Sequence, residues 1–261
     1  MPKFCANITM LFTEVPFENR FSEVKEAGFK FVEYLFPYGY EAGDLVDLLA
    51  SNGLTQVLFN LPAGDWEGGD RGIAGNPHRV DEFREGVDEA LKYAKALGVE
   101  RINCLVGKET EGVSLTEQWK TMVENITYAA DKLAAEGRTL VLEPINTFDI
   151  PGFLLNTTQD ALKIINEVKA KNLKIQYDVY HMQKMEGNLV ATIESYLEHI
   201  GHIQIADNPG RHQPGTGEIN YPFVLNALDR IGYEGYVGME YIPAPDTKTS
   251  LGWVKELGFE L

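Results

Sequence analysis

The stretch HIQIADNPGRHQPGTGEINYPFVLNALDRIGYEGYVGMEYI, from His202 to Ile242, contains the structural unit that decides the fold. It begins with a short run of alternating apolar and polar residues, which is typical of a strand. A loop rich in glycine and proline follows, then a segment that predicts a helix over 221–231 and a second strand-like run over 235–242. A strand, a helix and another strand in this order predict a parallel pair joined by a right-handed crossover.

The rest of the chain repeats this unit. The residues expected to form strands are 3–10, 29–35, 54–60, 101–107, 139–145, 173–180, 202–207 and 235–242. The segments expected to form helices are about 21–28, 41–52, 78–97, 116–136, 158–170, 188–199, 221–231 and 250–257, with Thr157 or Thr158 as a cap for the fifth. Eight strand–helix units in 261 residues predict an α/β fold, a single (β/α)8 TIM barrel formed by one domain over residues 1–261. A doubly wound open sheet is the alternative, but no strand is followed by a G-x-G-x-x-G pattern.

The composition limits the possible partners. The chain has 23 Lys and Arg residues against 39 Asp and Glu residues, which gives a net charge of −16. This charge repels a phosphate backbone, so nucleic acid is not expected as a partner, although a locally positive pocket can still bind a small anion. Only Cys5 and Cys104 are present, and neither a signal peptide nor a membrane-spanning run is visible. The expectation is a cytoplasmic protein without a membrane partner, and a homo-oligomer is possible.

Polar side chains close four successive predicted strands. They are Glu143 in LVLEPIN, Asp178 in IQYDVYHM, Gln204 in HIQIAD and Glu240 in VGMEYI. In a TIM barrel the C-terminal ends of the strands form the active-site face, so we expect all four on one wall of the barrel mouth. Each alone could simply cap a helix or pair with a nearby cation. Together, three carboxylates need a cation or a shared proton, and oxygen ligands favour Mg²⁺ or Mn²⁺ over zinc.

Three further residues in the loops are candidates for substrate binding. His181 follows Asp178 by three residues, and we interpret it as a substrate contact rather than a structural histidine. Arg211 follows the seventh strand and can hold a carboxylate with two parallel hydrogen bonds, with a salt bridge at the rim as the alternative. Arg71 is the natural anion contact in the glycine-rich loop GDWEGGDRG, which is either a lid over the substrate or a plain surface loop.

These segments resemble hydroxypyruvate isomerases, which belong to the xylose isomerase-like superfamily of TIM barrels. The resemblance rests on EPINT around Glu143, DVYHMQKMEGNL around Asp178 and His181, and GMEY around Glu240. Its most specific segment is HIQIADNPGRHQPGTGEINYP. FTEVPF and FNLPAGDWEGGDRGIA extend it over nearly the whole chain.

The resemblance implies an interconversion of hydroxypyruvate and tartronate semialdehyde through an enediolate, with Glu143 and Glu240 as the acid/base pair. It implies substrate contacts at His181 and Arg211. It also implies metal-site positions at Glu143, Asp178, Gln204 and Glu240.

Three residues depart from the pattern expected of relatives. Gln204 stands where ketose epimerases have a histidine ligand, Phe148 where arginine is expected, and Ile242 where lysine is expected. The departures at Phe148 and Ile242 keep open a 2-oxo-tetronate isomerase or a ketose 3-epimerase, and an inosose-type dehydratase would share the scaffold. A DNA-repair endonuclease needs a His-rich zinc site, which five histidines and the acidic charge disfavour. The presence of both Glu143 and Glu240 disfavours a non-catalytic sugar-binding barrel.

Overall fold

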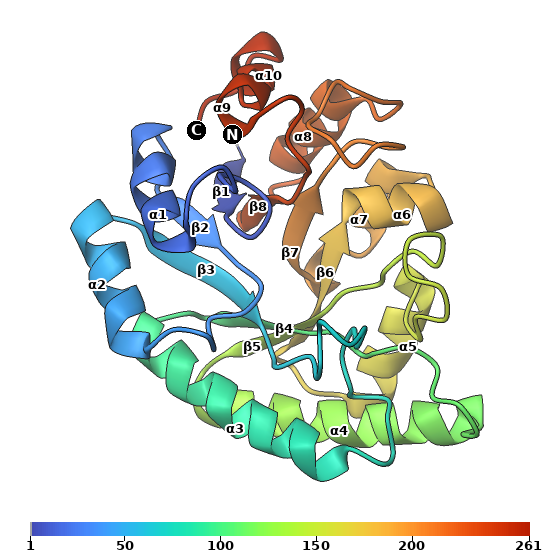
Figure 1. Cartoon of the computed structure of the whole chain (residues 1–261). Coiled ribbons are helices and arrows are strands. Elements are labelled where there is room, and N and C mark those ends of the chain that lie inside the picture. The colour runs from blue at the N-terminus through green and yellow to red at the C-terminus, as the bar shows by residue number, and fades with distance from the viewer. Residues whose placement is uncertain (1) are drawn as a thin grey trace.

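Eight parallel strands form the centre of the molecule and close into a barrel, which confirms the predicted fold (Figure 1). The computed structural model describes residues 2–261. Each strand pairs with the next one along the chain, and β8 pairs with β1 to close the ring. The strands are β1 (Lys3–Asn7), β2 (Phe31–Glu33), β3 (Thr55–Asn60), β4 (Arg101–Cys104), β5 (Thr139–Leu142), β6 (Leu173–Asp178), β7 (Ile200–Ile205) and β8 (Tyr236–Met239).

Helices form the outer layer around this barrel (Figure 1). They are α1 (Phe17–Glu26), α2 (Ala42–Asn52), α3 (Val80–Leu97), α4 (Leu115–Ala135), α5 (Thr158–Val168), α6 (Val179–Met185), α7 (Leu189–Ser195), α8 (Tyr221–Arg230), α9 (Thr247–Ser250) and α10 (Gly252–Glu256), with a 3-10 turn at Leu197–His199. Thr157 is the cap of α5, because its hydroxyl accepts the Asp160 N–H at 3.1 Å. In the part of the chain that the structure describes, none of these helices combines the length and apolar character that a bilayer span requires.

The segment after β6 differs from the prediction. The sequence predicts a strand to residue 180 and a helix over 188–199, whereas β6 ends at Asp178 and α6 begins at the next residue. Asp178 Oδ1 accepts the backbone N–H groups of Tyr180 and His181, so this carboxylate ends the strand and caps α6. The predicted helix over 188–199 is divided into α7 and the 3-10 turn. The predicted helix over 250–257 is divided into α9 and α10.

Apolar side chains form two cores. The main core lies between the sheet and the helices, and α3 illustrates it with buried side chains three or four residues apart, at Phe83, Val87, Ala90 and Ala94. A smaller cluster consists of Cys5, Val57, Leu58 and Val141. These residues come from β1, β3 and β5, which are not neighbours in the sheet, so the cluster fills the interior of the barrel. The interior of the barrel is therefore packed with side chains, and its mouth is where a TIM barrel is expected to bind its substrate.

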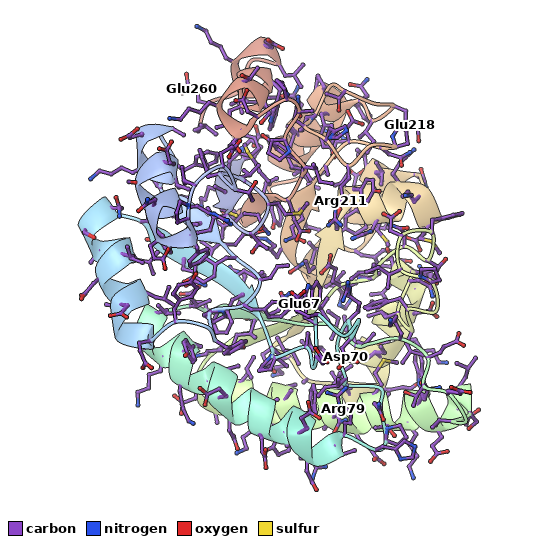
Figure 2. The ribbon with its side chains drawn as sticks, viewed as in Figure 1. Glu67, Asp70, Arg79, Arg211, Glu218 and Glu260 are labelled. Carbon is purple, nitrogen blue, oxygen red and sulfur yellow. The ribbon has the colours of Figure 1, made fainter. Side chains whose placement is uncertain are left out.

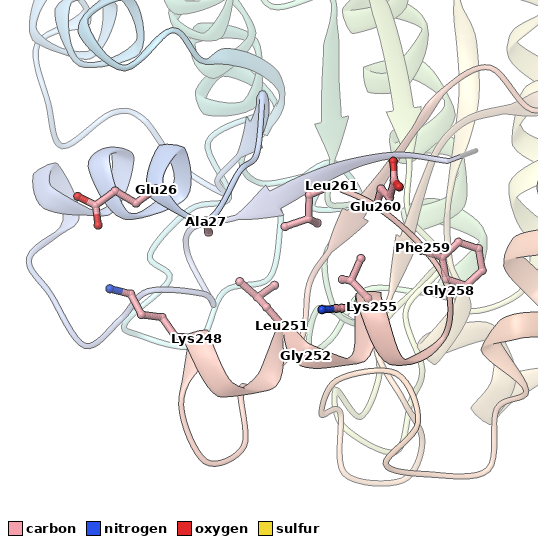
Figure 3. A pocket seen from close by; sticks show the side chains of 11 residues that line it. Glu26, Ala27, Lys248, Leu251, Gly252, Lys255, Gly258, Phe259, Glu260 and Leu261 are labelled. Carbon is pink, nitrogen blue, oxygen red and sulfur yellow. The ribbon is translucent and has the colours of Figure 1, made fainter.

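A wide groove lies on the outside of the barrel (Figure 3). It has a volume of about 950 Å³ and is lined by the end of α1, by α9 and α10, and by the last residues of the chain. Lys248 in this groove forms an ion pair with Glu23 at 2.7 Å. None of the predicted site residues lines the groove, so its size alone does not mark a site of catalysis.

Candidate active site

A smaller cavity of about 330 Å³ lies at the C-terminal ends of the strands. Five of the predicted site residues line it: Arg71, Glu143, His181, Arg211 and Glu240. Apolar side chains, among them those of Leu105 and Ile145, form much of the rest of its wall. A concave site with apolar walls and a few convergent polar groups is the usual form of a small-molecule site.

Glu143, Asp178 and His181 form an acidic centre beside this cavity, which Glu143 and His181 line and Asp178 does not. His181 Nε2 lies 3.7 Å from Glu143 Oε1 and 3.8 Å from Asp178 Oδ2, and all three side chains are buried. Asp178 Oδ2 is buried and has no hydrogen-bond partner in the described structure. An unpartnered buried carboxylate oxygen is costly, so this group of three is able to hold a cation.

The hydrogen bonds of His181 determine how it can act. Burial lowers its pKa to about 4, so the ring is neutral at pH 7. Asn146 Oδ1 accepts the N–H groups of Phe148 and Asp149, which leaves Asn146 Nδ2 to donate to His181 Nδ1 at 2.7 Å. The proton of the neutral ring is therefore on Nε2, which points toward Glu143. With its proton on Nε2, His181 is a hydrogen-bond donor to the cavity.

Glu143 carries its charge at a high free-energy cost. Burial, then the nearby charges of Glu240 and Asp178, raise its pKa well above the usual range of a glutamate. Asn103 Nδ2 donates to Glu143 Oε2 at 3.0 Å, and this is the one hydrogen bond to the carboxylate in the described structure. Glu143 is therefore a carboxylate that takes up a proton more readily than an ordinary glutamate, which suits it to acid/base chemistry.

Glu240 lines the same cavity as Glu143 and is likewise buried. Burial raises its pKa to about 8, even though the nearby Arg211 guanidinium opposes the shift. Arg211 Nη2 donates to Glu240 Oε2 at 3.1 Å, and Asn7 Nδ2 lies 3.4 Å from Oε1. Two glutamates with raised pKa values at one cavity form a plausible acid/base pair.

The loop after β7 holds Arg211 over the mouth of the barrel, as Figure 2 shows. Asp207 organises this loop, because its two oxygens accept backbone N–H groups from residues 208, 215, 217 and 219. Arg211 itself has a left-handed backbone, with φ of 56°, and its carbonyl accepts the Ile242 N–H at 2.8 Å. The hydrogen bonds of Asp207 thus hold the loop in the conformation that presents the Arg211 guanidinium.

Gln204 lies deeper in the barrel than the predicted wall of ligands suggests. Its Nε2 donates to Glu33 Oε1 at 2.8 Å, and its Oε1 accepts from Gln176 Nε2 at 2.6 Å. Both ends of the amide are therefore held by other side chains. Its role as a metal ligand stays a prediction and would have to use the second lone pair of Oε1.

Glu33 is the centre of a second buried cluster that the sequence reasoning missed. Its carboxylate accepts hydrogen bonds from Cys5, Asn7, His202 and Gln204. Burial opposes the charge of Glu33, but the charge of His202 and these hydrogen bonds lower its pKa. Gly238 on β8 makes room for it, because a Cβ there would lie 2.4 Å from Glu33 Oε1. The only signal in the sequence is a single acidic residue within the apolar run FKFVEYL.

Arg71 contributes a positive charge to the same cavity from the loop after β3. Its guanidinium stacks on the Trp66 ring at 4.1 Å and donates to the carbonyls of Trp66 and Asp70. No carboxylate of a described residue forms an ion pair with Arg71, whereas Arg211 is paired with Glu240. Arg71 therefore has more charge available for an anionic ligand.

The loop that carries Arg71 is attached to its surroundings at both ends. Gly72 forms a bridge with Val106, and its backbone approaches Leu105 so closely that a Cβ would lie 1.9 Å from the Leu105 carbonyl oxygen. Asp70 accepts from Arg79, the residue before α3, at 2.6 Å (Figure 2). Such contacts are typical of a fixed loop rather than of a freely moving lid.

Phe148 and Ile242 both lie at the exposed rim of the mouth. Their exposed fractions are 72% and 48%, so the two positions where cations are expected present apolar side chains to solvent. Lys184 of α6 places a cation near Phe148, with Nζ 6.0 Å from the ring centre, but Asp149 neutralises this lysine at 2.6 Å. Near Phe148 and Ile242 the rim thus offers little free positive charge, whereas Arg71 and Arg211 line the cavity itself.

Comparison with known proteins adds to this geometry. A family model described as the xylose isomerase-like TIM barrel matches residues 21–257. The chain belongs to this family. Its relatives in the family include the hydroxypyruvate isomerase of Escherichia coli (strain K12), which is 52% identical over 97% of this chain and 98% of that protein.

Two other relatives in the xylose isomerase-like family broaden this picture. A 2-oxo-tetronate isomerase of Cupriavidus necator is 44% identical over 98% of both chains. A crystal structure from Brucella melitensis, described as an AP endonuclease of family 2, is 43% identical and superposes with a TM-score of 0.95 over 98% of this chain and 99% of that one. The protein of known structure therefore has the same fold over nearly its whole length, and the sequence relatives align over nearly the whole chain.

Proposed function

We propose that the protein is an isomerase that interconverts hydroxypyruvate and tartronate semialdehyde. The observation that carries the proposal is the pair Glu143 and Glu240, two buried glutamates with raised pKa values at one cavity. The identity of 52% with a hydroxypyruvate isomerase over nearly the full length supports the substrate. Several relatives that are named isomerases share the same length of chain.

The reaction moves protons and leaves the carbon skeleton intact. A proton leaves C3 of hydroxypyruvate, which gives an enediolate, and a proton is added at C2, while the hydroxyl proton moves from the C3 oxygen to the C2 oxygen. One glutamate removes the proton from carbon. The other glutamate either returns a proton to carbon or transfers the hydroxyl proton between the two oxygens. These proton transfers need neither a covalent intermediate nor a redox cofactor.

The other cavity residues bind and orient the substrate. Arg71 and Arg211 attract the carboxylate of the substrate, and Arg71 has the greater free charge. The Nε2–H of His181 points toward Glu143 and can donate to an oxygen of the enediolate. Trp66 and Leu105 shield the site from water, which strengthens these charge interactions.

A divalent metal ion fits the acidic centre. The predicted ligands are Glu143, Asp178, Glu240 and Gln204. Of these, Glu143 and Asp178 belong to one buried group that could hold an ion with carboxylate oxygens, and the unpartnered Asp178 Oδ2 supports this fit. A set of oxygen ligands favours Mg²⁺ or Mn²⁺. When bound, such an ion supplies positive charge that stabilises a negatively charged enediolate.

An isomerase for the four-carbon 2-oxo-tetronate is the second candidate. The apolar rim at Phe148 and Ile242 and the 44% identity with a 2-oxo-tetronate isomerase favour it. An endonuclease is disfavoured by the charge of −16 and by the possible metal groups among the described residues, each of which contains a single histidine. We also propose a cytoplasmic location, which two free buried cysteines support.

A panel of hydroxypyruvate, 2-oxo-tetronate and common ketoses tests the proposal. Each substrate is followed in D₂O by proton NMR, in chelator-treated protein and after addition of Mg²⁺ or Mn²⁺. We expect hydroxypyruvate to lose its C3 proton signal and to yield tartronate semialdehyde, with most activity restored by the metal. Turnover of 2-oxo-tetronate alone would favour the second candidate. Binding without deuterium incorporation would overturn both, and full activity without metal would remove the ion from the mechanism.

A further inference from the structure

Asn7 and Asn103 occupy matching positions beside the two glutamates. β1 is the neighbour of β8 in the barrel, and β4 is the neighbour of β5, so each asparagine lies on the strand next to one glutamate. Asn103 Nδ2 donates to Glu143 Oε2 at 3.0 Å, and Asn7 Nδ2 approaches Glu240 Oε1 at 3.4 Å. Both asparagines are fully buried.

The Nδ2 group of each asparagine also donates to a second buried acceptor. Asn7 is in register with Glu33 of β2 and donates to Glu33 Oε1 at 3.1 Å, while its Oδ1 accepts the Thr9 N–H. Asn103 is in register with Asn60 of β3 and donates to Asn60 Oδ1 at 3.2 Å. Each asparagine therefore bridges one glutamate to an anchor on the strand beyond it.

This bridging restricts the side-chain freedom of the glutamates. Glu143 Oε2 is occupied by Asn103, which leaves Oε1 directed toward His181, at 3.7 Å from Nε2. Glu240 is held at both oxygens, by Asn7 and by Arg211. A reacting carboxylate must be held close to its productive geometry, and a displacement of about 1 Å can lower the rate by about 10²-fold.

We propose that Asn7 and Asn103 are positioning residues for the isomerisation, acting through Glu240 and Glu143. This inference rests on the proposed function, because it assigns the two asparagines to the same proton transfer. The donated hydrogen bond is the property that matters, since each asparagine offers an N–H to a carboxylate. An aspartate at either position has the same shape but offers only acceptor oxygens to another carboxylate.

The test compares four variants with the wild-type protein: Asn7→Ala, Asn7→Asp, Asn103→Ala and Asn103→Asp. We expect each alanine variant to lower kcat by roughly 10- to 100-fold with little change in KM. Each aspartate variant should lower kcat further than the alanine variant, because it adds a like charge next to the glutamate. Residues that only fill space would show the reverse order, with aspartate better tolerated than alanine.

Asn172→Ala serves as the matched control. Asn172 precedes β6, at the opposite end of the barrel, and donates to the carbonyls of Ala130 and Arg138. We expect this variant to lower the melting temperature while kcat per folded molecule stays unchanged. If the alanine and aspartate variants of Asn7 and Asn103 keep the wild-type kcat, the inference is overturned. If the wild-type protein itself has no isomerase activity, the proposed function is overturned instead.

Discussion

Two buried glutamates of the same barrel, Glu33 and Glu143, have opposite electrostatic environments. Glu33 is surrounded by four hydrogen-bond donors, and its pKa lies below the usual range. Glu143 accepts one hydrogen bond and has two other carboxylates as neighbours, and its pKa lies well above that range. Burial raises the pKa of both groups, so the difference comes from the number of donors and from the sign of the neighbouring charges.

This contrast separates a structural carboxylate from a functional one. A carboxylate whose oxygens are all satisfied stabilises the fold and has no capacity left for a ligand. A carboxylate with unsatisfied oxygens destabilises the unliganded protein. A proton, a cation or a substrate can supply the missing positive charge or hydrogen bond. The cluster of Cys5, Glu33 and His202 is a possible metal group by composition, but its hydrogen bonds assign it to the first kind.

The largest expected effect is on the rate. Glu240→Gln removes a group that can accept a proton and keeps its size, so we expect kcat to fall by roughly 10²- to 10⁴-fold. Circular dichroism and thermal melting should show an intact fold. The comparison is measured as initial rates with hydroxypyruvate, and a variant with wild-type kcat would contradict the acid/base assignment.

Glu33→Gln should have the largest effect on stability. The substitution removes the charge that His202, Gln204, Asn7 and Cys5 stabilise, and breaking a buried pair of this kind costs about 3–5 kcal/mol. Because folding lowers the pKa of Glu33, its contribution is present above the unfolded pKa and is lost as the pH falls through the folded pKa. Urea unfolding at several pH values should therefore show a difference that shrinks in acid. A constant difference would show that packing rather than charge is responsible.

Gly238→Ala tests how closely Glu33 is enclosed. The added Cβ would lie 2.4 Å from Glu33 Oε1, so we expect a loss of about 1–3 kcal/mol from overpacking. Gly39→Ala is the control, because its Cβ would have no atom within 4 Å. Denaturant unfolding of both variants measures the difference. Equal stabilities would mean that the Glu33 cluster can shift without cost.

Glu143→Gln should have the smallest effect on stability of these variants, and one of opposite sign. Folding raises the pKa of Glu143, so its contribution to stability is complete below the unfolded pKa and is lost as the pH rises through the folded pKa. The uncharged glutamine avoids this loss, so the metal-free variant should melt above the metal-free wild type, increasingly so at alkaline pH. A lower melting temperature for the variant at pH 8 would show that Glu143 is a structural carboxylate like Glu33.

The sequence predicted the fold because the βα alternation is visible residue by residue. The strand ends at Glu143, Asp178 and Glu240 were also predictable, since chain order alone brings neighbouring strand ends together. One domain over residues 1–261 stays a prediction, although the closed barrel draws its strands from residues 3–239. The early start of α6 was missed because the strand-like run of residues continues to Tyr180, whereas the local cap by Asp178 begins the helix at Val179.

The polar interior of the barrel could not be predicted in the same way. Asn7, Asn103 and Glu33 lie within apolar runs, where a single polar residue points inward or outward depending on the register. Gln204 illustrates the limit: its position at a strand end was visible, but not the two partners that hold its amide. Such networks depend on contacts between strands that are far apart in the chain.

The attachment of the Arg71 loop has a consequence for the kinetics of binding. Its contacts with the β4 segment and with Arg79 order the loop when the chain folds, so substrate binding need not supply that ordering entropy. Association should then be limited by diffusion into an open mouth, with a salt dependence set by Arg71 and Arg211 against the acidic surface. Changes of substrate preference would in turn come from exchanged side chains at the rim rather than from altered loop mobility.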